Sequence, residues 1–393
     1  MGHYSEYLNK QMSFPAIEAE RKKQLMAISQ TRGGRDILVY ASDLKNHKQA
    51  PVGIDYSDIL PFQDQLAQLS GEAIDIIIET PGGQAEVVED LVRLVRDRYE
   101  SVAIIVPGWA KSAGTIFAMA ADEILMGPTS ALGPIDAQIQ ENGNKFISAD
   151  EYLDGLKAIL QEVKDSGGSL NAAYIPILQN ITPGAIQHYH NAQLLSSTLV
   201  KQWLYQYKFK SWQMHSHTGN QVTDEERRST AERIAETLCR NSQWLTHARS
   251  LSQADLQKLG LQVINFMVPP ELGESIMRYY TLLQMGFDTT NMYKMIETVS
   301  SQIYRFKVDT ANAPGKPAPG LQKVEVDCPK CRHHFVVQYS LGKVAPREPG
   351  LMVFPLDSGK VWCPKCHSEI DMNDFRRKTE AESGMSFVGF NKE

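Results

Sequence analysis

Two apolar runs, each followed by a turn that contains glycine, constrain this fold most. Residues 74–78 (Ile-Asp-Ile-Ile-Ile) lead into the turn Pro81-Gly82-Gly83, and residues 102–106 (Val-Ala-Ile-Ile-Val) lead into a second turn around Ser112. Short apolar runs of this kind are typical of strands buried on both faces. Between them, residues 85–98 carry apolar side chains at helical intervals. The sequence therefore predicts strand–helix–strand units and a largely parallel sheet.

Both turns follow the carboxyl ends of consecutive strands, so right-handed crossovers bring them to the same edge of the sheet. Gly82 and Gly83 allow a carbonyl oxygen to approach backbone N–H groups, and the small residues Ala113 and Gly114 leave the Ser112 hydroxyl open. Serine is also a common helix N-cap, and Pro-Gly-Gly is a common turn. The two together favour acyl transfer, which needs a nucleophile beside donors for an oxyanion.

These motifs carry a resemblance to a known family. Residues 76–83 and 112–124 resemble the Clp/crotonase superfamily, and within it the serine dehydrogenase proteinase (SDH) branch, related to signal peptide peptidase A. Residues 131–138 resemble the next signature of that branch, and residues 246–249 with 259–263 resemble its late helix–strand element. The resemblance implies a Clp/crotonase-like α/β fold, with repeated ββα units, a parallel sheet and helical extensions.

The resemblance also implies an activity and an assembly. Ser112 would be the nucleophile of a serine peptidase, and the N–H groups of Gly82 or Gly83 and of Ala113 would bind the oxyanion. Protomers of the family form rings or stacked rings, so we expect a homo-oligomer that acts on peptide or protein substrates.

The proton acceptor is the part of the site that is hardest to find in the sequence. Clp-type peptidases have a histidine after the nucleophile, but residues 132–136 contain none. Signal-peptide-peptidase relatives use a lysine about forty residues after the serine, but here residues 148–153 contain the acids Asp150 and Glu151 and no lysine. Lys157, among apolar neighbours on a predicted helix, is the candidate base, because a lysine base must be desolvated. The other candidates that the sequence offers are Lys145, Lys111, His188, His190 and His247, with His215 and His217 expected in a solvated loop.

A metal site is the second strong signal. Cys328 and Cys331 form one Cys-Pro-Lys-Cys unit, and Cys363 and Cys366 form another. Two Cys-x-x-Cys turns can complete a tetrahedron of sulfur around one zinc ion. Since sulfur fills all four positions, the predicted site is structural and resembles a zinc ribbon. A module this small needs its metal to stay folded.

Composition bounds the remaining possibilities. The net charge of −6 and the balanced charges of the C-terminal segment do not favour nucleic-acid binding, so a protein partner is the better expectation for the ribbon. The sequence shows no signal peptide and no membrane-spanning run, which predicts a cytoplasmic protein. We expect five segments: an N-terminal helical segment (1–35), the peptidase domain (36–270), a helical extension (271–309), a linker (310–322) and the zinc ribbon (323–393).

The sequence thus predicts a serine endopeptidase that acts through Ser112. One alternative is a catalytically weak Clp-like scaffold that binds protein partners through its ring and its ribbon. Another is a crotonase-type acyl-CoA enzyme, against which a serine at this turn argues.

Overall fold

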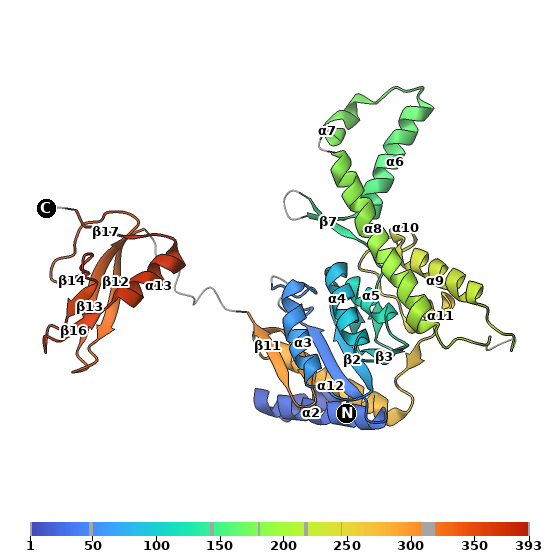
Figure 1. The fold of residues 1–393 in the computed structure, drawn as a ribbon, viewed down its shortest axis with the longest axis horizontal. Coiled ribbons are helices and arrows are strands. Elements are labelled where there is room, and N and C mark those ends of the chain that lie inside the picture. Colours follow the sequence, from blue (N-terminus) through green and yellow to red (C-terminus); the bar gives the residue numbers. More distant parts are fainter. Residues whose placement is uncertain are drawn as a thin grey trace. The chain divides into compact units, whose positions relative to one another are not determined.

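The computed structural model describes residues 2–46, 50–141, 145–179, 181–215, 219–244, 246–307 and 319–391. The chain forms two compact units, Met1–Lys307 and Val308–Glu393 (Figure 1). The first unit contains the predicted parallel sheet and the turn around Ser112. The second contains the four paired cysteines.

The first unit alternates helices and strands. Its helices and helical turns are α1 (His3–Asn9), α2 (Phe14–Thr31), η1 (Tyr56–Asp58), α3 (Ile59–Ala67), α4 (Ala85–Arg96), α5 (Ala113–Met119), α6 (Ala149–Asp165), η2 (Ala172–Tyr174), α7 (Ile175–Leu178), α8 (Pro183–Trp203), η3 (Leu204–Lys208), α9 (Asp224–Cys239), α10 (Asn241–Trp244), α11 (Gln253–Lys258) and α12 (Pro270–Asp288). Its strands are β1 (Asp36–Ser42), β2 (Ala73–Glu79), β3 (Ser101–Val106), β4 (Trp109–Ala110), β5 (Glu123–Met126), β6 (Ala131–Leu132), β7 (Gln138–Glu141), β8 (Lys145–Ser148), β9 (Ile264–Asn265), β10 (Met292–Thr298) and β11 (Gln302–Phe306).

The main sheet has seven strands in the order β11-β10-β1-β2-β3-β5-β9. Strands β1, β2, β3, β5 and β9 are parallel to one another. Strands β10 and β11 extend the β1 edge in antiparallel fashion. The predicted α/β fold with a parallel sheet is therefore confirmed.

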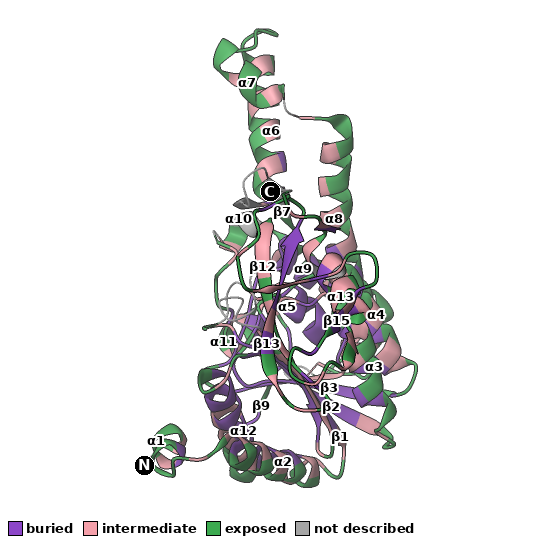
Figure 2. Ribbon diagram, turned by 90° about the vertical axis from the view of Figure 1, so that its left-hand side faces the viewer, coloured by how far each residue is buried: buried purple, intermediate pink, exposed green. Residues whose placement is uncertain are grey.

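Helices cover both faces of this sheet. Ile76 and Ile104 belong to one apolar cluster, which includes residues of α3, α4, α5 and α8. Their neighbours Ile77 and Ile105 belong to a second cluster, with residues of α2 and α12. Figures 1 and 2 show α2 and α12 on one side of the sheet, with buried residues concentrated between the layers. Alternate residues thus point to opposite faces, which explains why the strands are apolar throughout.

The prediction of a helical extension over residues 271–309 is wrong for the second half of that range. Helix α12 ends at Asp288, and the chain then forms β10 and β11. Strand β10 pairs with β1 and is buried along most of its length, including the charged residues Lys294 and Glu297. Pairing with β1 determines that this segment forms a strand. The sequence does not indicate a buried strand here, because charged residues interrupt the apolar pattern.

A small second layer lies beyond the carboxyl ends of β2 and β3. The N–H of Thr80 donates to the Trp109 carbonyl (2.9 Å), and the N–H of Lys111 donates to the Thr80 carbonyl (3.0 Å). Strand β4 also runs parallel to β6. This layer joins the Pro81-Gly82-Gly83 turn to the segment that precedes Ser112, so the two turns predicted to meet do so.

Helices α6, α7 and α8 form an arm that extends from the body of this unit (Figure 1). The arm carries large exposed apolar side chains at Leu160, Ile175, Ile177 and Leu194. Among the described residues, no helix is long and apolar enough to cross a membrane.

The second unit is built on a small sheet in the order β12-β13-β14, with β17 paired to β13, and on a separate β15–β16 hairpin. Its elements are β12 (Gly320–Asp327), β13 (His334–Leu341), β14 (Met352–Val353), β15 (Lys360–Trp362), β16 (Glu369–Asp371), α13 (Asn373–Ser383) and β17 (Phe387–Val388). The predicted linker, 310–322, lies mostly outside the described residues. The predicted domain boundaries stay predictions.

Candidate active site

Ser112 occupies a strained turn between β4 and α5. Its backbone has φ 49° and ψ −115°, in a region that residues with a side chain rarely adopt. Such strain concentrates at functional sites, and nucleophilic serines at strand-to-helix turns are held in this way. The side chain is half-buried, and its hydroxyl has no hydrogen-bond partner among the described residues. The hydroxyl is therefore free to meet a substrate.

The Gly82–Gly83 turn packs directly against Ser112. A Cβ on Gly82 would lie 2.7 Å from the Ser112 Cβ, and one on Gly83 would lie 2.3 Å from the backbone nitrogen of Ile54. Both glycines also have positive φ, 114° and 150°. Glycine is therefore required at both positions by space and by conformation.

The backbone N–H groups of the two turns differ in whether they already donate a hydrogen bond. The Gly82 N–H is buried and donates to Thr80 Oγ1 at 3.2 Å. The N–H groups of Gly83 and Ala113 have no hydrogen-bond partner in the part of the chain that the structure describes. Of the two glycines that the sequence offers as oxyanion donors, the geometry favours Gly83.

A network of hydrogen bonds holds residues 53–54, which pair with Gly83. The Ile54 N–H donates to the Gly82 carbonyl (2.8 Å), and the Gln84 N–H donates to the Ile54 carbonyl (2.9 Å). Next to Ile54, the Gly53 carbonyl accepts from Lys294 Nζ at 2.7 Å. Lys294 in turn binds both carboxylate oxygens of the buried Asp58, at 2.8 and 3.0 Å. Strand β10, which the sequence did not reveal, thus braces the turn beside Ser112.

Glu79 is the last residue of β2 and comes just before the same turn in the sequence. Its carboxyl group accepts from the Trp109 N–H (2.8 Å) and from the Tyr280 hydroxyl (3.1 Å). Burial raises the pKa of Glu79 to about 8, although both hydrogen bonds act in the opposite direction. Glu79 is therefore largely protonated at neutral pH and joins α12 to the layer that contains Ser112.

Lys111 precedes Ser112 but does not act on its hydroxyl. Its amine donates to the carbonyls of Leu132 (3.2 Å) and Arg249 (3.0 Å) and to Ser250 Oγ (2.9 Å). Burial lowers the pKa of Lys111 to about 8. That value is still above neutrality, and three acceptors occupy all three N–H bonds of the ammonium. Lys111 thus holds the segment 249–250 against the turn.

The environment that a lysine base needs is missing around Lys157. Its side chain is 67% exposed on the arm helix α6 and forms an ion pair with Asp154 at 2.7 Å. That pairing raises the pKa of Lys157, which is the opposite of what a base requires. Apolar neighbours in sequence did not produce burial, because they lie on other faces of an exposed helix. The structure does not support Lys157 as the base.

The other candidate bases differ in their positions. His188 and His190 are exposed on α8, and His215 contacts Glu226 at 3.3 Å in its loop. His217 and the side chain of Lys145 lie outside the described part of the structure. Among the candidates whose side chains the structure describes, His247 alone faces a buried carboxylate: its Nδ1 is 3.6 Å from Oδ2 of Asp136. The sequence does not single out Asp136, since only the fold brings it to a histidine more than a hundred positions away.

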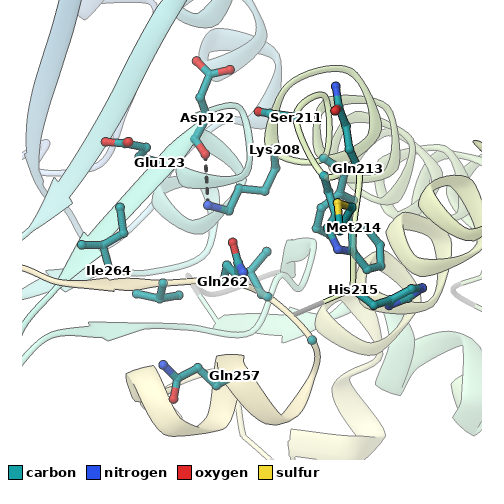
Figure 3. A pocket seen from close by; sticks show the side chains of 15 residues that line it. Asp122, Glu123, Lys208, Ser211, Gln213, Met214, His215, Gln257, Gln262 and Ile264 are labelled. Atoms are coloured by element: carbon teal, nitrogen blue, oxygen red, sulfur yellow. Dashed lines mark hydrogen bonds between the residues drawn. The ribbon is translucent and has the colours of Figure 1, made fainter. Parts of the chain in front are cut away.

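A pocket in the first unit is separate from this site. It has a volume of about 1220 Å³ and lies between the start of β5, the end of η3 and residues 257–264 (Figure 3). Lys208 donates there to the Asp122 carbonyl at 3.0 Å, and burial lowers the pKa of Lys208 to about 8. The pocket adjoins the amino end of β5, whereas Ser112 follows the carboxyl end of β3. None of its lining residues belongs to the Ser112 site.

The four cysteines of the second unit form one cluster. Their sulfur atoms all lie within 4.8 Å of one another. Both Cys-Pro-Lys-Cys turns have the same backbone bonds: the N–H of Arg332 donates to the Cys328 carbonyl (2.8 Å), and that of His367 donates to the Cys363 carbonyl (2.9 Å). Arg332 and His367 also share a positive φ, 55° and 52°. This matched set of four sulfur donors can bind a metal ion.

Comparisons with known proteins find a family that is similar to the segment containing Ser112. Residues 66–164 match the family described as ClpP-like SDH-type serine proteinases. Two proteins of Methanocaldococcus jannaschii are related in sequence. The first, "Uncharacterized protein MJ1495", is 37% identical over 84 residues, which cover 21% of this chain and 29% of that protein. The second, "Uncharacterized protein MJ0137", is 27% identical over 139 residues, which cover 33% of this chain and 46% of that protein. The chain spans less than half the length of either relative.

Two solved structures of the 1510-N membrane-bound stomatin-specific protease are also similar. A serine-to-alanine mutant is 18% identical, with a TM-score of 0.30 over 54% of this chain and 74% of that one. A lysine-to-alanine mutant in complex with a substrate peptide is 20% identical, with a TM-score of 0.30 over 53% and 68%. A structural likeness with this TM-score does not identify any functional residue of this chain. The segment 66–164, which contains Gly82, Gly83 and Ser112, is similar to ClpP-like SDH-type serine proteinases.

Proposed function

We propose that this protein is a serine peptidase in which Ser112 attacks the carbonyl carbon of a peptide bond. The observation that carries the proposal is the open Ser112 hydroxyl beside two free backbone donors, the N–H groups of Gly83 and Ala113. The match of residues 66–164 to serine proteinases supports it. The attack would form a tetrahedral intermediate, whose oxyanion accepts from both donors. Collapse would release the amine and leave an acyl-enzyme, which water then hydrolyses.

Hydrolysis of an unfolded protein tests this function. The wild type should generate new amino termini over time, and Ser112→Ala should generate essentially none. Ser197→Ala is a suitable control, because Ser197 is only partly buried on α8 and its hydroxyl donates to the Leu194 carbonyl of the same helix. Equal cleavage by wild type and Ser112→Ala would refute the proposal. A wild type that cleaves nothing would favour the scaffold alternative.

Homo-oligomerisation is part of the same proposal. The exposed apolar residues of the arm, among them Leu160 and Leu194, support an interaction surface there. Sedimentation should show a species larger than one chain, and Leu160→Lys with Leu194→Lys should dissociate it. A monomeric wild type would refute this part alone.

The cysteine cluster of the second unit fits structural zinc. The four sulfur donors provide a closed tetrahedral set, which leaves no position for a substrate. The Ser368 hydroxyl lies 3.3 Å from Cys328 Sγ and 3.1 Å from Cys366 Sγ, and it lowers the pKa of both thiols. Lower pKa values favour the thiolate form that binds metal. The unit would then present its surface to a protein partner.

A further inference from the structure

Ser112 needs a proton acceptor, and the segment 246–251 is the part of the chain that the fold brings to its turn. Leu251 and Leu132 exchange backbone hydrogen bonds, at 2.9 and 3.1 Å. Lys111, the neighbour of Ser112, donates to the carbonyl of Arg249 and to the hydroxyl of Ser250. The segment is therefore attached on two sides, to β6 and to the residue that precedes the nucleophile.

The chain that faces this segment is attached to the helix of the nucleophile. Thr115, three residues after Ser112 on α5, donates to the Gly133 carbonyl at 3.0 Å and accepts from the Gly133 N–H at 3.0 Å. Gly133 begins the short stretch that ends at Asp136. Residues 133–136 and 246–251 thus both lie against the turn that holds Ser112.

Asp136 is a fixed and buried carboxylate within that stretch. Its side chain is 2% exposed. Ser148 Oγ donates to Oδ1 at 2.7 Å, and Gln138 Nε2 donates to Oδ2 at 2.7 Å. Two hydrogen bonds hold this buried carboxylate in one orientation. The carboxylate is thus oriented before any further partner joins it.

His247 is the partner that this carboxylate faces. Its Nδ1 lies 3.6 Å from Asp136 Oδ2, and it is buried without a hydrogen-bond partner among the described residues. A movement of about 0.6 Å would bring this pair to hydrogen-bond distance. An Nδ1–H directed at a buried carboxylate leaves Nε2 as the acceptor, and the carboxylate then stabilises the imidazolium that forms. Asp136 is the only charged group for which the described structure records a contact with the His247 ring.

We propose that His247 is the general base for Ser112 and that Asp136 is its positioning residue; this inference rests on the peptidase function proposed above. Nε2 of His247 takes the proton of the Ser112 hydroxyl while Oγ bonds to the peptide carbon, and the carbonyl electron pair moves to oxygen. The imidazolium then gives that proton to the leaving nitrogen as the C–N bond breaks. In deacylation, Nε2 takes a proton from water and returns it to Oγ.

The rate of labelling by a fluorophosphonate tests the base without requiring a known substrate. In that reaction Ser112 Oγ bonds to phosphorus, fluoride leaves, and the hydroxyl proton passes to the base. His247→Ala should label about a hundredfold more slowly or worse, because general bases contribute about 10²–10⁴ in rate. Added imidazole should restore part of that rate, which a merely structural loss would not allow. His190→Ala is the matched control, since His190 is exposed on the arm.

The role of Asp136 is tested by measuring whether the effect of its substitution on the labelling rate depends on His247. Asp136→Asn should slow labelling in the wild-type background and have little further effect in His247→Ala, because a residue that acts through another is not additive with it. A wild-type rate in His247→Ala, or a slow rate that imidazole leaves unchanged, would overturn the inference. A wild type that is not labelled at all would instead refute the proposed peptidase, so the two failures are distinct.

Discussion

The backbone of Gly82 lies so close to Ser112 that a methyl group on Gly82 would sit 2.7 Å from the Ser112 Cβ. Packed carbon atoms do not approach so closely. The separation makes the glycine turn and the serine turn one unit, in which the position of the nucleophile depends on its neighbour.

Gly82→Ala should therefore abolish serine reactivity. The added methyl group must displace Ser112, and the φ of 114° at this position is unfavourable for alanine. Fluorophosphonate labelling of the purified variant measures the effect, and circular dichroism reports whether the fold persists. Gly155→Ala is the control, because Gly155 is on α6 with open space around its Cα. A folded Gly82→Ala variant that labels at the wild-type rate would contradict the described packing.

Lys294→Met should destabilise the first unit. Removing the amine takes one partner away from the buried carboxylate of Asp58. Tyr40 and Arg305 still contact this carboxylate, at 2.8 and 2.9 Å. Breaking a buried ion pair by removing one partner costs roughly 3–5 kcal/mol in the free energy of unfolding. Urea unfolding measures this cost. The double variant Lys294→Met with Asp58→Asn should recover part of the lost stability, and a single variant as stable as the wild type would contradict this description of the network.

Glu79→Gln should alter the dependence of stability on pH. The pKa of Glu79 is raised from 4.5 to about 8 in the folded chain, so its contribution is complete below about 4.5 and is lost as the pH rises through about 8. Glutamine does not titrate: its Oε1 can accept from the Trp109 N–H, and its Nε2 can donate to the Tyr280 hydroxyl oxygen. Between these pH values, the free energy of unfolding of the wild type should fall relative to that of Glu79→Gln, by at most about 1.4 kcal/mol per pH unit.

Urea unfolding near the two ends of that range measures the Glu79 effect. Glu89→Gln is the control, since Glu89 is exposed on α4. Parallel pH dependences for the wild type and Glu79→Gln would show that Glu79 does not remain protonated when it is buried.

Cys363→Ser should lower the bound zinc. The wild type should contain about one zinc ion per chain, since four sulfur donors complete one tetrahedral site. Loss of one donor should weaken binding and destabilise the small second unit. Elemental analysis after dialysis measures the metal. Cys239→Ala is the control, because Cys239 lies in the first unit at the end of α9, and unchanged zinc in Cys363→Ser would contradict the proposed site.

Local sequence patterns predicted the central strands and the two turns. Strands β2 and β3 could be predicted because they are buried on both faces and are apolar throughout. Strand β10 could not, because the partners of its buried Lys294 and Glu297 include residues far away in sequence, among them Asp58 and Arg21. Its burial depends on pairings that no local pattern records.

Sequence reasoning about the site was limited in the same way. The choice between Gly82 and Gly83 depends on a hydrogen bond from Gly82 to Thr80, which the order of residues does not reveal. Lys157 was a reasonable candidate only if its helix were buried, and the helix belongs to an exposed arm. His247 could be named from the sequence, but its proposed role depends on Asp136, which only the tertiary structure places beside it.

Identification of the residue that carries a fluorophosphonate adduct tests the central claim most directly. The protein is labelled in its native state, digested, and analysed by mass spectrometry, with a heat-unfolded sample as the control. We predict a single adduct on Ser112 in the native protein and none in Ser112→Ala. An adduct on another serine, or equal labelling of wild type and Ser112→Ala, would contradict the assignment of Ser112 as the nucleophile.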